Sequence, residues 1–267
     1  KRQAEAYGFA ERLEALNRER RELTLQAEAE AERQLADQLA EDPYLFIVQS
    51  PAFQSGIVGL VAGKLTDRFY RPAIVIEEGT EESRGSARSI PEVDISAALD
   101  QVSDLLVRHG GHQRAAGFTV ETARLPDFRA ALQAVVTETL APYGDLRPTL
   151  TIDAVAPLSE LSWSLVEQFG RLEPTGQGNE PPLLLTPGVR VREARSVGNG
   201  KHLKLVLDGG PGEPVFDAIG FGLGDAARAL ASGTRIDVVG ELNVNEWNGR
   251  RQLQLIVKDL CSTGVEQ

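Results

Sequence analysis

The chain has 267 residues, 42% of them hydrophobic and 25% charged, with a formal net charge of -11 at pH 7. This composition is typical of a soluble globular protein, and the chain is long enough for two domains. One cysteine, Cys261, and the absence of a long apolar run exclude a disulfide framework and a membrane span, so we expect a cytoplasmic protein without membrane contact.

The N-terminal segment, residues 9–41, contains neither Pro nor Gly and is rich in Ala, Glu, Arg, Leu and Gln, which predicts a long helix. Its apolar stripe is thin, so we expect a spacer helix that joins domains, with a coiled coil as the alternative. Pro43 is expected to end the helix. The chain begins at Lys1 and has no methionine, which suggests a piece of a longer protein or a deliberately methionine-free sequence.

Apolar strands then alternate with amphipathic helices, which predicts an α/β domain with a mixed sheet and flanking helices. The expected strands cover 44–50, 71–79, 83–90 and 116–121, and the expected helices cover 55–70, 94–111 and 125–142. In the helix 94–111, Asp94 or Ser96 is expected to cap the start, and Gly110 is expected to take the left-handed position that stops it.

The sequence changes in character after Pro148. A helix is expected over 163–174, and from residue 183 onward short alternating runs are separated by Gly-rich turns. The segment "EWNGRRQLQLIV" places Asn-Gly between two extended runs, which indicates a hairpin. About five strands with one helical insert predict a closed β-barrel of the oligonucleotide/oligosaccharide-binding (OB) type. The expected domains are the long interdomain helix over 1–42, the α/β domain over 43–147 and the OB barrel over 148–267.

The strand "SRGSARSI" alternates side chains of two kinds. Arg84, Ser86 and Arg88 share one face, and two guanidinium groups around a hydroxyl suit a phosphate. Gly85 and Ala87 keep the opposite face lean for packing. The alternative is a solvated edge strand that carries arginines for solubility.

The segment "RHGGHQRAAGF" (108–118) combines backbone freedom with an imidazole. Gly110 and Gly111 let the main chain approach a ligand closely, and His112 can donate to a phosphate oxygen or offset its charge when protonated. The alternative is a helix stop with an incidental histidine, which fits His109 better.

The acidic net charge argues against a strong polyanion binder, but the charge is uneven. Residues 190–204 carry a basic stripe against one acid, Glu193. The basic residues are Arg190, Arg192, Arg195, Lys201 and Lys204.

The Arg-Gly-Ser-x-Arg-Ser strand followed by an amphipathic helix and then Gly-Gly-His-x-x-Ala-Ala-Gly-Phe resembles the DHH-associated domain of the DHH phosphoesterase superfamily. Longer motifs resemble the RecJ family of single-strand-specific exonucleases within it. These motifs are "GIVGLVAGKLTDRFYRPAIVI" (56–76), "LEPTGQGNEPP" (172–182) and "LNVNEWNGRRQLQLIVKD" (242–259). Thr175 departs from the pattern, because that position of the family signature is aromatic.

The resemblance implies the C-terminal part of an enzyme that degrades single-stranded DNA from its 5′ end in DNA repair and recombination. Such enzymes use two divalent ions, Mn²⁺ or Mg²⁺, held by an N-terminal DHH domain that this sequence lacks. His109, His112 and His202 have no clustered carboxylates at ligand spacing, so we expect no metal site in this chain and no activity in isolation. The expected partners are single-stranded DNA, the DHH domain within the same protein and, as a family expectation, single-strand-binding protein.

The resemblance also implies residue roles. His112 would contact the scissile phosphate and support the transition state, as the catalytic residue of this chain. In the OB barrel, Trp247 or Phe221 would stack on bases, with a hairpin clamp as the alternative for Trp247. The DNA- and phosphate-binding residues would be Arg84, Ser86, Arg88, Ser89, Gly110, Gly111, Arg114, Arg190, Arg192, Lys201, Lys204 and Trp247.

Two other functions compete with this interpretation. The first is a stand-alone module that binds single-stranded nucleic acid. The second is a phosphodiesterase of the DHH superfamily that acts on short oligonucleotides or cyclic dinucleotides. An OB barrel argues against the second, because small substrates need no extended path for a strand.

Overall fold

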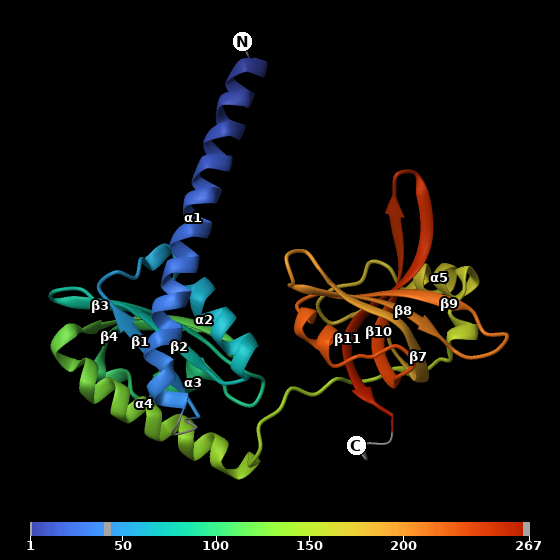
Figure 1. Cartoon of the computed structure of the whole chain (residues 1–267). Helices are drawn as coiled ribbons and strands as arrows, with labels where there is room; N and C mark the ends of the chain where they lie inside the picture. The colour runs from blue at the N-terminus through green and yellow to red at the C-terminus, as the bar shows by residue number, and fades with distance from the viewer. Residues whose placement is uncertain (1, 40–43, 264–267) are drawn as a thin grey trace. The chain divides into compact units, whose positions relative to one another are not determined.

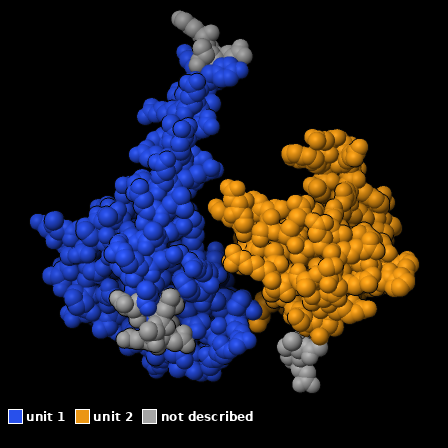
Figure 2. Space-filling view, in the orientation of Figure 1, with its two compact units in different colours: residues 1–148 blue, residues 149–267 orange. Residues whose placement is uncertain are grey.

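The computed structural model describes residues 2–39 and 44–263 (Figure 1). The chain divides into two compact units, residues 1–148 and 149–267, which Figure 2 shows in two colours. Pro43, the predicted end of the first helix, and Lys1 lie outside the described residues. No helix among the described residues is long and apolar enough to cross a membrane.

Unit 1 is built on a mixed sheet with helices on both faces, which confirms the predicted α/β class. The sheet has the strand order β1-β2-β3-β5-β4, in which β1 and β2 are parallel and the other neighbours are antiparallel. The strands are β1 (Phe46–Ser50), β2 (Ala73–Glu77), β3 (Glu82–Arg88), β4 (Leu106–His112) and β5 (Ala115–Glu121). The helices are α1 (Arg2–Leu39), α2 (Ser55–Phe69), α3 (Ile95–Gln101) and α4 (Leu125–Leu140).

Helix α1 is docked along only part of its length. Ala27, Ala31 and Leu35 are buried in a cluster with α2, β1 and β2. Figure 1 shows the N-terminal half of α1 extending away from the rest of unit 1. There Phe9 and Leu13 stay exposed on the helical face that continues the buried stripe.

The two faces of the sheet are covered unequally. On one face, Ala87 and Phe118 join a large apolar core that includes α3 and α4. On the other face, α1 and α2 bury residues such as Val48 and Val75 of β1 and β2. The residues of β5 and β4 that point to this second face include the exposed Gly117 and His112. The β4 and β5 side of the second face is therefore partly open to solvent.

The predicted helix over 94–111 is wrong beyond its first turns. Asp94 caps α3 as expected, its carboxylate accepting a hydrogen bond from the Ala97 N–H at 3.0 Å, but α3 ends at Gln101. Leu106–His112 is strand β4, paired antiparallel with β5 through a tight turn. Gly110 therefore lies within a strand and stops no helix, because sheet pairing overrides the local apolar spacing that favoured one.

Unit 2 is a closed five-stranded barrel, as the OB prediction expected. Neighbouring strands follow the order β10-β11-β9-β8-β7, and β10 pairs with β7 to close the ring. These strands are β7 (Leu183–Val197), β8 (His202–Asp208), β9 (Val215–Gly220), β10 (Arg235–Trp247) and β11 (Arg250–Ser262). Short β6 (Ala154–Val155) adds to β7, and helix α5 (Trp163–Phe169) precedes the barrel.

Candidate nucleic-acid interface

Strand β3 lies inside the sheet, between β2 and β5. The alternative of a solvated edge strand is therefore wrong. Gly85 and Ala87 are buried on the face of the apolar core, where the Phe118 ring fills the space above Gly85: a Cβ there would lie 2.1 Å from a ring carbon. The other face of β3 presents Arg84, Ser86 and Arg88, as the alternation predicted.

Pairing brings the Arg/Ser strand and the Gly-Gly-His segment onto one face. Residues directly opposite each other in neighbouring strands point to the same side. Across β3, β5 and β4 they form three rows, Arg84–Thr119–Arg108, Ser86–Gly117–Gly110 and Arg88–Ala115–His112. We call these nine residues the open face. The two outer rows of the open face thus carry the cationic and imidazole side chains, and the middle row between them contains two glycines.

The middle row is free of obstruction. A Cβ at Gly110 would meet no atom within 4 Å, and one at Gly117 would meet only the Gly85 carbonyl oxygen, at 3.8 Å. These glycines are therefore not required for packing within unit 1. They leave a flat floor on which a ligand can approach the backbone.

Helix α2 borders the open face at Gly59. A Cβ at Gly59 would lie 3.1 Å from both the Ser86 Oγ and an Arg88 guanidinium nitrogen. Arg88 Nη1 donates to Ser86 Oγ at 3.2 Å and to the Ala87 carbonyl at 2.9 Å. Because Ser86 Oγ accepts this bond, its own O–H proton can donate to a ligand. Arg88 is thereby oriented beside a free hydroxyl donor.

Three further predicted ligand residues make contacts within the fold. Ser89 is 2% exposed, and its hydroxyl donates to the Val93 carbonyl at 2.8 Å, so this hydroxyl does not face a ligand. Gly111 points to the opposite face, where a Cβ would lie 2.4 Å from the Ala115 carbonyl oxygen. Arg114 lies in the turn between β4 and β5 and donates from Nε to the Ser89 carbonyl at 2.7 Å.

Arg108 is a candidate that the sequence analysis did not select. Its guanidinium Nε donates to the Thr119 Oγ1 at 3.1 Å. A depression of about 290 Å³ lies between Arg108 and Arg84 over Gly117 and Phe118. Alternation of Arg108, Gly110 and His112 would have revealed it, had residues 106–112 been recognised as a strand.

In the barrel, the predicted cations Arg190 and Arg192 share one carboxylate. Arg190 Nη2 and Arg192 Nε donate to the same Asp208 Oδ2 at 2.6 and 2.8 Å. The Arg192 hydrogen bond, the Gly210 N–H and the Arg190 hydrogen bond together hold the pKa of Asp208 well below its usual value. The two guanidinium groups are still about half exposed, so each retains donors, but Asp208 offsets part of their charge.

Lys201 differs from Lys204 in its surroundings. Lys204 Nζ lies 3.4 Å from the Asp217 carboxylate. Lys201 is exposed in the turn before β8 and makes no ion pair with any described residue. The exposed Phe221 ring lies near this turn, edge-on to the His202 ring with centroids 5.3 Å apart. A free cation beside an exposed aromatic ring suits a nucleotide.

Trp247 ends β10 at the tip of the predicted hairpin. Asn248 and Gly249 form the turn with φ values of 50° and 72°, the left-handed conformation that Asn-Gly favours. The Trp247 side chain is 73% exposed, so it does not clamp a core. It is available for stacking.

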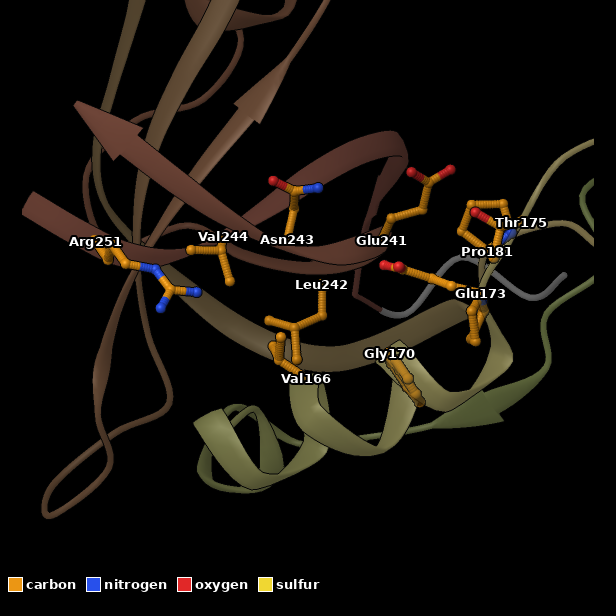
Figure 3. Close-up of a pocket in the computed structure, with 12 residues that line it drawn as sticks. Val166, Gly170, Glu173, Thr175, Pro181, Glu241, Leu242, Asn243, Val244 and Arg251 are labelled. Carbon is orange, nitrogen blue, oxygen red and sulfur yellow. The ribbon is translucent and has the colours of Figure 1, made fainter.

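A pocket of about 380 Å³ lies between α5 and β10 in unit 2 (Figure 3). Figure 3 shows the carboxylates of Glu173 and Glu241 at one end and Arg251 at the other. Part of the wall comes from the segment 172–182, where Asn179 Nδ2 donates to the carbonyls of Leu172 and Pro174. The two acids make this pocket a poor site for phosphate.

Metal chemistry has no site in the described part of this chain. Residues 2–39 and 44–263 contain no group of three or more His, Cys, Asp or Glu side chains that could hold an ion. A two-metal centre needs several such ligands around both ions. The residues present therefore do not fit it.

Two domain families match this combination of an α/β domain and a barrel. Residues 42–138 match the DHHA1 domain, and residues 152–259 match the RecJ OB domain. The chain is therefore a DHHA1 domain followed by an OB barrel.

Several known proteins match nearly the whole chain. The chain is 33% identical over 96% of its length to the single-stranded-DNA-specific exonuclease RecJ of Bacillus subtilis, and 30% identical over 96% to RecJ of Thermus thermophilus. The crystal structure of Thermus thermophilus RecJ with Mn²⁺ superposes with a TM-score of 0.77 at 29% identity, covering 97% of this chain. Over these two domains the chain belongs to the RecJ family. It spans 32% and 35% of the length of these two curated relatives, and 36% of the crystallised chain.

The Asp208 cluster predicts acid sensitivity of the barrel. A carboxyl whose pKa is lowered by folding stabilises the fold above its unfolded pKa and loses that contribution as pH falls toward the folded pKa. We expect Asp208→Asn to lower the melting temperature at about pH 7 and to shrink the difference between about pH 7 and pH 3. Calorimetry with the exposed Asp225→Asn as control measures this. An equal loss at both pH values would contradict it.

Proposed function

We propose that this chain binds single-stranded DNA and supplies the substrate-binding wall of a 5′-to-3′ exonuclease. It would be the C-terminal portion of that enzyme. The two-metal centre would be held by a DHH domain outside this chain, so the isolated chain binds DNA without digesting it. The relatives that share both domains are single-stranded-DNA-specific exonucleases.

One observation carries this proposal: Arg88 and His112 occupy the same row of the open face. They stand on β3 and β4, with the small Ala115 between them on β5. Strands lie about 4.8 Å apart, so the two Cα atoms are about 10 Å apart, and both side chains can reach one phosphate above Ala115. The row joins a guanidinium charge, a hydroxyl donor from the neighbouring Ser86 and an imidazole.

His112 can respond to the negative charge that develops on a phosphate during cleavage. Its exposed imidazole can donate a hydrogen bond to a non-bridging phosphate oxygen. When protonated, it offsets the negative charge that builds on the phosphoryl oxygens during displacement. Arg88 carries its charge at every pH and would hold the ground state and the transition state alike.

The barrel would hold the strand away from the reacting end. Phe221 and Trp247 offer exposed rings to bases, and Lys201 offers a free charge to the backbone. Base stacking contributes about 1–3 kcal/mol per base, which suits binding without sequence preference. A stand-alone binding module would use the same barrel but has no need of the Arg88–His112 row.

We expect His112→Ala, in a protein that also carries the DHH domain, to slow cleavage of 5′-phosphorylated single strands far more than it weakens binding. The expected loss in kcat is about 100-fold, because one transition-state donor is removed. His109→Ala is the matched control, since His109 points to the opposite face and pairs with Asp100 at 2.8 Å. Equal losses in kcat and affinity would leave His112 with a binding role alone.

We expect the salt dependence of binding to single-stranded DNA to fall when barrel cations are removed. The slope of log K against log salt drops by about 0.7 for each phosphate that the protein no longer neutralises. Lys201→Gln alone should lower the slope by this full amount, because Lys201 has no described ion-pair partner that already offsets its charge. The full variant replaces by Gln the cations Arg190, Arg192, Lys201 and Lys204.

The matched control replaces an equal number of exposed arginines on α1. These are Arg12, Arg18, Arg20 and Arg21. The control should keep the original slope. An unchanged slope in the full barrel variant would refute the barrel assignment.

A further inference from the structure

The open face has cations at both ends, and only one end is used by the proposed function. Arg88 and His112 form one end row, and Arg84 and Arg108 form the other. The depression of about 290 Å³ lies at this second row and is lined by both arginines. Gly117 and Thr119 of β5 also line it, and Gly117 carries no side chain.

Arg108 is held in place by a hydrogen bond from one side of its guanidinium group. Its Nε donates to Thr119 Oγ1 at 3.1 Å, and Thr119 is 3% exposed, so the bond fixes the fork on a rigid strand. The two terminal nitrogens make no ion pair with any described residue, and Arg108 itself is exposed. A fork with two parallel free donors is the geometry that binds a phosphate bidentately.

The charges around the second row are asymmetric. Glu77 of β2 pairs in register with Arg84, so the Arg84 side of the row carries an acid as well as a cation. Arg108 lies on β4, three strands from Glu77 and about 14 Å from it across the sheet. An anion in the depression is therefore expected to bind chiefly to Arg108.

We propose that Arg108, with Arg84 as the second donor, forms a separate binding position for a phosphodiester of the same DNA strand. The inference rests on the proposed function, because it assigns a second phosphate to the strand that Arg88 and His112 hold. Arg84 and Arg88 are four positions apart on β3, which is about 13 Å along the strand. This exceeds the backbone span of one nucleotide, so the two positions hold phosphates that are not neighbours. Gly117 and Gly110 form the floor beneath the nucleotide between them.

The test is a cycle between protein and DNA variants, with the whole 267-residue chain. A short 5′-phosphorylated oligothymidylate is made with one linkage at a time replaced by a neutral methylphosphonate. Affinities are measured for the original chain, Arg108→Gln, Arg88→Gln and Arg18→Gln. Arg18 is an exposed residue of α1 and serves as the control for loss of one charge. Circular dichroism confirms that each variant is folded.

We expect Arg108→Gln to lower affinity about tenfold, the effect of one hydrogen bond to a charged group. At one linkage, combining the methylphosphonate with Arg108→Gln should reduce the affinity no more than either change alone. Arg88→Gln should show the same coupling at a different phosphate, and Arg18→Gln at none.

The outcomes separate the two proposals. If Arg88→Gln is coupled to a phosphate but Arg108→Gln is additive at every linkage, the second position is overturned and the proposed function stands. If both couple to the same linkage, there is one phosphate position and the second is likewise overturned. If neither Arg88→Gln nor removal of any charge changes affinity, the proposed function fails, and the second position fails with it.

Discussion

The register of β3, β5 and β4 is the constraint on which the rest of the structure depends. A strand exposes alternate residues, so a shift of one residue would move every polar group of the open face into the apolar core. Phe118 fixes the register at the centre, because its ring occupies the space that a side chain at Gly85 would need. Because side chains alternate along β5, the register that buries Phe118 places Gly117 and Thr119 on the other face.

The helices cover the two faces of the sheet unequally, and this leaves the polar side chains set by the register accessible to a ligand. Helices α3 and α4 cover one face, whereas on the other face α1 and α2 cover β1 and β2, and α2 reaches the border of β3 at Ser86 and Arg88. Arginine and histidine side chains on β3 and β4 therefore stay in contact with solvent and avoid the desolvation that burial would impose, yet their backbone is held by paired strands. Such side chains are better ordered for recognition than the same residues on a loop.

The sequence predicted the β3 part of this site and, on β4, Gly110 and His112, but it missed Arg108 and the strand itself for a physical reason. Arg84, Ser86 and Arg88 alternate in a segment with no helical signal, so their common face could be inferred directly. Residues 94–111 begin with a capped amphipathic helix, and local spacing alone does not show where that helix ends. Pairing with β5 decides it, and pairing is a long-range interaction.

Individual partners were equally invisible to local patterns. The basic stripe was correctly identified as a run of cations, but Asp208, which binds Arg190 and Arg192, lies beyond it in sequence and comes into register through β7 and β8. The hairpin at Asn248 was predictable, because its turn chemistry is encoded in two adjacent residues.

Contact between DNA and the glycine floor is the most direct measure of whether the open face is a binding surface. Intermolecular nuclear Overhauser effects can be recorded between a 5′-phosphorylated oligothymidylate and the Hα protons of Gly110 and Gly117 in the labelled chain. Contacts from these glycines to deoxyribose protons are the expected result. Contacts confined to residues 149–267, or to the α3 and α4 side of the sheet, would contradict it.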